Sequence, residues 1–162
     1  MAPSDGNYAE YCEEFLSNYE QRLLMLTSLF AGTTELLRSL AQRGMPWGIV
    51  TNKAARFTEP IVRGLADLQP EMVVIRGDTL AHAKPHPAPL LEAARRLAIE
   101  PARCLYVGDD LRDMQAARAA GMAGMAALWG YMGDAPVNDG GADALAHQPC
   151  DVLAWVEQRV GV

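Results

Sequence analysis

The sequence predicts an α/β fold built on an open parallel sheet. From Leu29 onward, short apolar runs alternate with segments whose apolar side chains have helical spacing, and turn residues separate the two. Strands joined by single helices pair in parallel through right-handed crossovers. Half of the 162 residues are apolar, which is enough for a core at this length and excludes disorder of the whole chain.

The first part of the chain contributes two predicted helices and one strand. Residues 8–25 form a helical, acidic and then apolar segment that stands apart from the rest of the chain. A second helix begins after Gly32, where Glu35 suits the first turn, and Gly44 ends it. The apolar run 47–51 (WGIVT) then predicts the first strand, buried on both faces.

The next elements repeat this alternation. Residues 56–65 predict a helix with Phe57, Ile61 and Leu65 on one stripe, and residues 72–75 (MVVI) predict the second strand. A turn-rich, proline-rich stretch, residues 82–89, leads to a helix. That helix carries Leu90, Leu91, Ala94 and Leu97 on one face.

The remaining elements complete the predicted sheet. Residues 104–107 (CLYV) form the third strand, and a helix over 112–120 comes after it. Residues 124–129 form the fourth strand, and residues 151–160 form a closing helix.

Composition excludes several classes of protein. Fourteen Lys and Arg against twenty Asp and Glu give a net charge of −6 with no basic cluster, so no nucleic-acid partner is expected. The longest run without charge, residues 119–133, is shorter than the ~20 residues of a membrane-spanning helix, so no membrane partner is expected either. Cys12, Cys104 and Cys150 have no paired spacing and suggest reduced thiols in a cytoplasmic protein.

Polar side chains occur at or after the ends of three of the predicted strands, on the side where parallel sheets bind ligands. Thr51 and Asn52 end the first strand, where a hydroxyl and free backbone N–H groups suit an anion. Lys84 lies in the proline-rich stretch after the second strand, where it suits phosphate as a point charge. A helix cap and an ordinary surface lysine remain alternatives.

The third strand leads into three carboxylates, Asp109, Asp110 and Asp113. Carboxylates one turn apart at a strand end suit Mg²⁺, although capping of the next helix would also use an Asp there. Hydroxyl, lysine and carboxylates meeting at one edge are the groups that Mg²⁺-dependent phosphoryl transfer requires.

Three motifs in this order carry a resemblance to a known family: GIVTNK at 48–53, KPHP at 84–87 and YVGDDLRD at 106–113. The chain resembles haloacid dehalogenase superfamily phosphatases. Within them it is similar to the phosphoglycolate phosphatase group and close to the N-acetylmuramic acid 6-phosphate phosphatases. The resemblance implies a Rossmann-like, three-layer α/β core with an open parallel sheet.

The resemblance also implies roles for the polar residues. Thr51 would hydrogen-bond the transferred phosphoryl group with Asn52 nearby, and Lys84 would neutralise charge on the nucleophile and phosphoryl oxygens.

For the metal, the resemblance implies that Asp109 ligates Mg²⁺ and that Asp113 supports the site directly or through water. Asp110 is a further candidate, at a position where relatives often carry Ser or Thr.

One part of the family pattern is not found. The family's chemistry starts with an Asp-x-Asp-Gly motif, whose first Asp attacks phosphorus while the second acts as general acid and base. The sequence contains no Asp-x-Asp. We therefore expect a core without its first, central strand: a remnant of a helical cap and return linker over 1–28, and an incomplete core over 29–162. Two sheet edges would then be open, which favours a domain-swapped or intertwined homodimer.

The sequence leaves two functional hypotheses. The first is a Mg²⁺-dependent phosphatase of a small phosphorylated metabolite such as phosphoglycolate, with N-acetylmuramic acid 6-phosphate as the alternative substrate. It would react through an aspartyl-phosphate and be inactive as this chain alone. The second is a non-catalytic phosphate- or Mg²⁺-binding or interaction module derived from a phosphatase.

Overall fold

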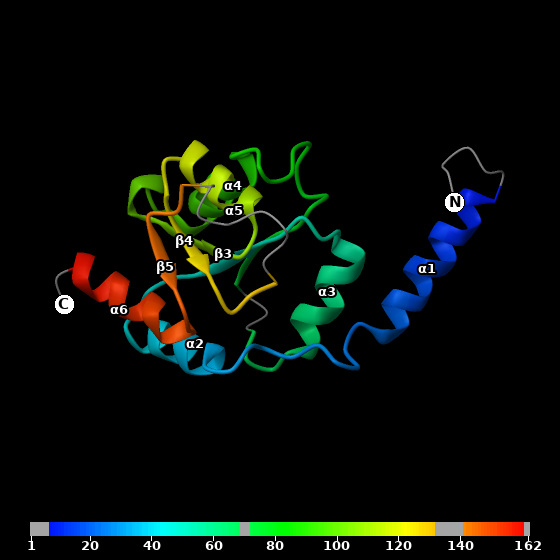
Figure 1. The fold of residues 1–162 in the computed structure, drawn as a ribbon, viewed down its shortest axis with the longest axis horizontal. Coiled ribbons are helices and arrows are strands. Elements are labelled where there is room, and N and C mark those ends of the chain that lie inside the picture. Colours follow the sequence, from blue (N-terminus) through cyan, green and yellow to red (C-terminus); the bar gives the residue numbers. More distant parts are fainter. Residues whose placement is uncertain (1–6, 69–71, 132–140, 161–162) are drawn as a thin grey trace.

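The computed structural model describes residues 7–68, 72–131 and 141–160 (Figure 1). The helices are α1 (Tyr8–Arg22), α2 (Thr33–Gln42), α3 (Ala55–Gly64), α4 (Ala88–Leu97), α5 (Leu111–Ala119) and α6 (Pro149–Val160), with a short 3₁₀ turn at Pro101–Arg103. The strands are β1 (Gly48–Val50), β2 (Val73–Ile75), β3 (Leu105–Gly108), β4 (Ala123–Ala127) and β5 (Ala144–Ala146).

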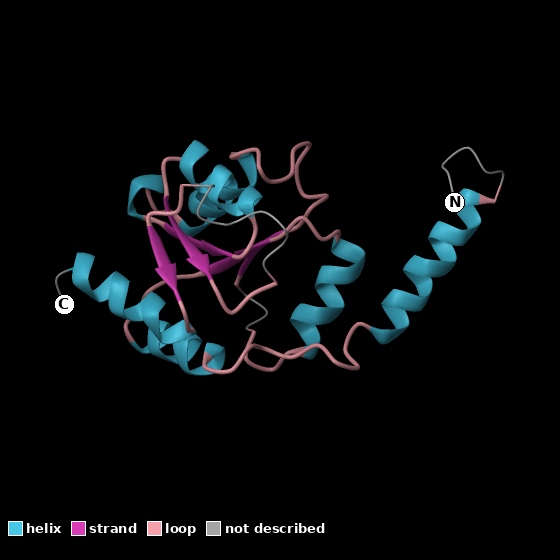
Figure 2. Ribbon diagram, in the orientation of Figure 1, coloured by secondary structure: helices cyan, strands magenta, loops and turns pink. Residues whose placement is uncertain are grey.

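The parallel sheet is divided into two pieces, as Figure 2 shows. One piece pairs β1 with β2, and the other has the order β3–β4–β5; every pairing is parallel. The described residues supply no strand between β1 and β3. The predicted α/β class is confirmed, and the partial sheet agrees with the expected core that lacks a central strand.

Helices cover both faces of the sheets and make a three-layer core. In Figure 1, α4 and α5 lie on one side of the strands and α2 and α6 on the other. Alternation along β3 explains this arrangement, because successive side chains of a strand point to opposite faces. Leu105 and Val107 pack with the cluster of Met125 and α6, whereas Tyr106 packs with the cluster formed by α4 and α5.

The first helix stands apart from the core. Figure 1 shows α1 extending away from the sheets, and none of its residues is buried. Surface contacts attach it to α3: Arg56 lies 2.8 Å from carboxylate oxygens of both Glu13 and Glu20, and the rings of Tyr19 and Phe57 meet edge to face. The division into a cap remnant over 1–28 and a core over 29–162 stays a prediction.

The structure corrects some of the predicted elements. Strand β5 was not among the four predicted strands, because it consists of three residues without a β-branched or aromatic side chain. The predicted strand over 124–129 ends at Ala127, and the closing helix starts at Pro149 rather than at residue 151.

Two further expectations concern cysteines and membranes. The three cysteines are free thiols. In the described part of the chain, no helix has the length and apolarity needed to cross a membrane.

Candidate active site

The acidic segment after β3 is shaped by the start of α5. Asp110 is the N-cap residue, and its carboxylate accepts a hydrogen bond from the backbone N–H of Arg112 at 2.8 Å. In return, the backbone N–H of Asp110 donates to Oδ2 of Asp113 at 3.2 Å. This reciprocal capping box fixes Asp113 beneath the end of β3. Helix capping, the alternative noted for these carboxylates, is therefore a role that Asp110 has.

Two glycines make room for the carboxylates. A Cβ atom on Gly108 would overlap the side chain of Asp113, and a Cβ atom on Gly130 would overlap the side chain of Asp109. With glycine at both positions, Oδ2 of Asp109 reaches the backbone N–H of Tyr131 and accepts a hydrogen bond at 2.7 Å. Asp109 and Asp113 are thus held against the backbone in fixed places.

Asn52 holds the loop that carries Lys84. Its side-chain amide donates to the carbonyl oxygen of Lys84 at 2.9 Å, and its Oδ1 accepts from the backbone N–H of Lys84 at the same distance. These paired bonds attach the proline-rich loop to the end of β1. Asn52 therefore positions Lys84, a task that the sequence had not indicated.

The ammonium of Lys84 enters a nearly buried polar cluster. Its Nζ lies 2.7 Å from Oδ1 of Asp113, 2.8 Å from the hydroxyl of Tyr106 and 3.2 Å from the carbonyl oxygen of Val50. The side chains of Lys84 and Asp113 are 11% and 6% exposed. The hydroxyl of Tyr106 also lies 3.1 Å from the Val50 carbonyl oxygen, to which it donates.

Two pKa shifts define protonation states at the site. Burial, and then the charge of Asp113, raise the pKa of Tyr106 well above its ordinary value, so its hydroxyl keeps the proton. The hydrogen bond from the Arg112 guanidinium lowers the pKa of Asp110 to about 2, so this carboxylate is ionised at neutral pH.

The predicted residues converge on one cleft, with one exception. A cleft of about 200 Å³ is lined by Asn52, Lys84, Asp109, Asp110, Arg112 and Asp113. Thr51 does not line it: its hydroxyl accepts a hydrogen bond from the backbone N–H of Lys53 at 3.1 Å, beside the cleft at the end of β1. Arg112 was not predicted to line the site, although it lies within the acidic motif.

The charges of the cleft single out Asp109. Lys84 pairs with Asp113, and Arg112 pairs with Asp110 at 2.6 Å. In the described parts of the chain, Asp109 has no cationic partner. Mg²⁺ commonly takes one or two protein carboxylates and completes its shell with water and phosphate oxygens. The donor set therefore fits Mg²⁺ at Asp109, although three metal-ligating side chains do not converge anywhere in the described residues.

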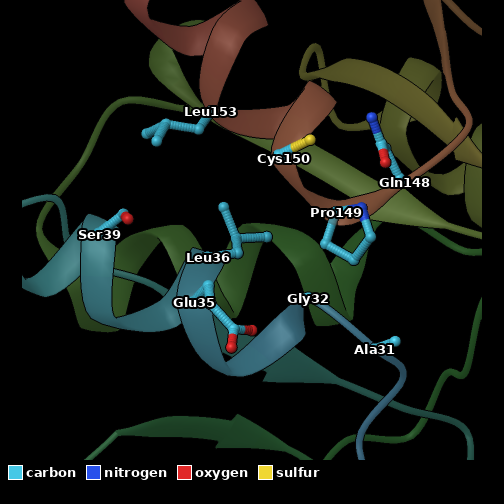
Figure 3. A pocket seen from close by; sticks show the side chains of 9 residues that line it. All are labelled: Ala31, Gly32, Glu35, Leu36, Ser39, Gln148, Pro149, Cys150 and Leu153. Carbon is cyan, nitrogen blue, oxygen red and sulfur yellow. The ribbon is translucent and has the colours of Figure 1, made fainter.

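A larger pocket lies elsewhere. Figure 3 shows the side chains that line a pocket between α2 and the start of α6, among them Leu36 and Leu153. The volume of this pocket is about 340 Å³. The pocket is lined by one carboxylate, Glu35, and one thiol, Cys150, and its lining contains no Lys or Arg that could bind an anion. The candidate active site is accordingly the smaller cleft at the carboxyl ends of β1 and β3.

Comparisons with known proteins identify relatives of this chain. A phosphoglycolate phosphatase of Xanthomonas campestris pv. campestris (strain 8004) is 50% identical over 137 residues, which are 84% of this chain and 62% of that protein. An N-acetylmuramic acid 6-phosphate phosphatase of Pseudomonas aeruginosa is 38% identical over 150 residues, 91% of this chain and 66% of that protein. The chain thus spans less than two thirds of the length of these relatives.

Solved structures share the fold. The crystal structure of a predicted phosphoglycolate phosphatase from Haemophilus somnus 129pt superposes with a TM-score of 0.85 at 27% identity, covering 94% of this chain and 68% of that one. The family model of haloacid dehalogenase-like hydrolases matches residues 3–127. Together with the geometry of the cleft, these matches show that the chain belongs to the haloacid dehalogenase-like hydrolases.

Proposed function

We propose that this chain provides the phosphate-binding and metal-binding part of a cytoplasmic phosphatase that acts on a small phosphorylated metabolite, of which phosphoglycolate is the first candidate. The observation that carries the proposal is the cleft itself, where the Lys84 ammonium and the Asp109 carboxylate, which has no cationic partner in the described residues, both line the space. The phosphatase names of the relatives support the substrate class.

Some residues of the cleft would bind the phosphoryl group, and others would bind the metal ion. Lys84 attracts the phosphoryl oxygens by its charge, and the exposed guanidinium of Arg112 adds positive charge at the rim. Thr51 lies beside the cleft at the end of β1, and its hydroxyl would reach the phosphoryl group only by turning from the backbone N–H of Lys53 toward the cleft. Asp109 would hold Mg²⁺ with Asp113 supporting it, and Mg²⁺ when bound would neutralise charge on the phosphoryl oxygens.

The nucleophile of the proposed reaction comes from another segment. Asp110 and Asp113 are occupied by Arg112 and Lys84, and Asp109 is assigned to the metal. We therefore expect no turnover from the described residues alone. A strand bearing an Asp-x-Asp pair would complete the site from the open edges of β1 and β3, and its first Asp would form the aspartyl-phosphate.

A second candidate is a non-catalytic phosphate- or Mg²⁺-binding module. The paired charges at Lys84 and Arg112 favour it, because they compensate the carboxylates of Asp113 and Asp110 without a nucleophile. For the enzyme hypothesis, N-acetylmuramic acid 6-phosphate is the alternative substrate, supported by the Pseudomonas relative.

Hydrolysis assays with complementation test the proposal. The purified chain is assayed with Mg²⁺ and phosphoglycolate, N-acetylmuramic acid 6-phosphate or p-nitrophenyl phosphate. The assay is repeated after co-expression with the part of the Xanthomonas relative that lies outside the matched region. Turnover that needs the added segment and is lost in Asp109→Asn supports the proposal.

Two other outcomes would distinguish the phosphatase from the binding module or contradict the assignment of the nucleophile. Phosphate binding without turnover in every combination favours the binding module. Turnover by the unassisted chain shows that one of its own carboxylates is the nucleophile, which contradicts the assignment above.

Within the described residues no strand covers the facing edges of β1 and β3, which also favours the intertwined homodimer, in which a second copy contributes a strand. Sedimentation equilibrium tests this part separately: a stable, folded monomer contradicts it.

A further inference from the structure

Basic side chains follow β1, β2 and β3 at the edge of the sheet where the cleft lies. Those after β2 and β3 form ion pairs: Arg76 with Glu59, Lys84 with Asp113 and Arg112 with Asp110. Lys53, which follows β1, pairs with no carboxylate in the part of the chain that the structure describes. Its positive charge is therefore not compensated by an acidic side chain there.

The backbone of Lys53 is fixed beside the cleft. Asn52, the preceding residue, lines the cleft. The carbonyl oxygen of Lys53 accepts hydrogen bonds from the backbone N–H of Gly77 at 2.9 Å and from the hydroxyl of Thr58 at 3.0 Å. The Lys53 side chain thus starts from a fixed point next to the proposed phosphate site, and its flexible stem sets where the charge lies.

The ammonium of Lys53 has a neutral partner. It donates a hydrogen bond to the hydroxyl of Tyr19 on α1, whose ring rests edge to face against Phe57 of α3. An ammonium has three N–H donors, so in the described structure two of them remain for a ligand. Lys84, the other lysine of the chain, directs three donors at acceptors of the protein itself. Lys53 is thus the lysine that can bind an anion without giving up a partner.

A second anionic group of the substrate suits this position. Lys84 and Arg112 already line the cleft that would hold the phosphoryl group. At about 200 Å³ the cleft is smaller than the ~300 Å³ at which small-molecule pockets begin, so part of a substrate lies outside it. An ammonium with free donors beside the cleft suits a carboxylate, with which it forms charge-assisted hydrogen bonds. Phosphoglycolate carries a carboxylate one methylene away from its ester oxygen.

We propose that Lys53 is a specificity-determining residue that binds a carboxylate on the alcohol part of the substrate, beside the phosphoryl group in the cleft. The inference rests on the proposed function and narrows its substrate class to small phosphate monoesters with a carboxylate close to the phosphate. Tyr19 holds the ammonium through a neutral hydroxyl, which leaves the charge of Lys53 available to the ligand.

Calorimetry on the full chain in the presence of Mg²⁺ tests the inference with two ligands that differ in one group. Phosphoglycolate carries the carboxylate, and 2-hydroxyethyl phosphate has a hydroxymethyl group in its place. The wild type should bind phosphoglycolate more tightly. Lys53→Met should reduce this preference about fivefold, the equivalent of one partly exposed hydrogen bond between charged groups.

Arg63→Gln is the matched control. It removes an equal charge from α3, where Arg63 pairs with Glu59 of the same helix, and it should keep the wild-type preference. If Lys53 serves only to attach α1, Lys53→Met changes the affinities for both ligands by the same factor. That result overturns the inference.

The ligand without a carboxylate separates this result from a failure of the proposed function. If the wild type binds neither 2-hydroxyethyl phosphate nor inorganic phosphate, the cleft is not a phosphate site and the inference falls with it. If the wild type binds both esters with equal affinity, the proposed function stands and the role of Lys53 is wrong. This comparison needs no variant, so it decides the matter even if Lys53→Met does not fold.

Discussion

The ammonium of Lys84 lies 2.7 Å from a carboxylate oxygen of Asp113, and both side chains are nearly buried. Lys84 comes from the loop after β2, whereas Asp113 lies in the first turn of α5. This ion pair therefore joins the two pieces of the sheet at the cleft. Removal of either residue should lower the stability of the fold, because it leaves the other charge nearly buried without a counter-ion.

We expect Lys84→Met to destabilise the chain by about 3 kcal/mol, since it leaves the Asp113 carboxylate buried without its cation. Chemical unfolding of the two proteins measures this difference. Adding Asp113→Leu to Lys84→Met should recover much of the loss, because an apolar pair carries no such penalty. Equal stability of Lys84→Met and wild type would show that the pair is solvated in solution.

Gly130→Ala should weaken Mg²⁺ binding at least about tenfold, the usual effect of disturbing a group that orients a metal ligand. The added methyl would overlap the Asp109 side chain and push its carboxylate away. Gly124→Ala is the control, because a Cβ there meets the flexible Met114 and the methyl of Ala117 at 3.3 Å or more. Mg²⁺ titration by calorimetry compares them, and equal affinities would contradict the assignment of Asp109.

Asp151 should make the stability of the chain pH-dependent. Hydrogen bonds from the backbone N–H groups of His147 and Gln148, at 2.8 and 3.1 Å, lower the pKa of this carboxyl. Because the folded pKa lies below the unfolded one, the stabilisation is complete above the ordinary Asp range near 4 and is lost as the pH falls through the lowered pKa.

Thermal unfolding of wild type and Asp151→Asn checks this sign. The variant should melt a few degrees lower at pH 7, and the difference should shrink toward pH 2. A difference that is constant with pH would mean that the carboxylate charge does not strengthen the hydrogen bonds from His147 and Gln148.

Exchange of amide hydrogens should be fast in α1 and slow in β4. Helix α1 has no buried residue and is attached by ion pairs of Arg56, whereas Met125 and Ala126 of β4 are almost completely buried. Arg56→Gln should accelerate exchange in α1 further and leave β4 unchanged. Arg63→Gln is the control, because Arg63 also lies on α3 but pairs with Glu59 of the same helix and not with α1. Equal protection of α1 and β4 would contradict this expectation.

The α/β class and the location of the cleft were predictable because their signals are local. Apolar runs and helical spacing identify strands and helices over a few residues, and parallel strands place their carboxyl ends at one edge. Asn52, Lys84 and the carboxylates of Asp109 and Asp113 were found in this way, and they do line one cleft. Strand β5 was not predicted, because its three residues carry no such signal.

What each polar residue does at the cleft depended on tertiary structure. Lys84 and Asp113 are far apart in the sequence, and they meet because the loop after β2 and the start of α5 pack at the same edge. The same packing lets Asn52 hydrogen-bond the backbone of Lys84. It also leaves the Thr51 hydroxyl bonded to the backbone N–H of Lys53 and brings the Tyr106 hydroxyl to the carbonyl oxygen of Val50. Sequence periodicity gives the direction of a side chain from its strand or helix, but hydrogen-bond partners depend on distances that arise only when the elements pack together.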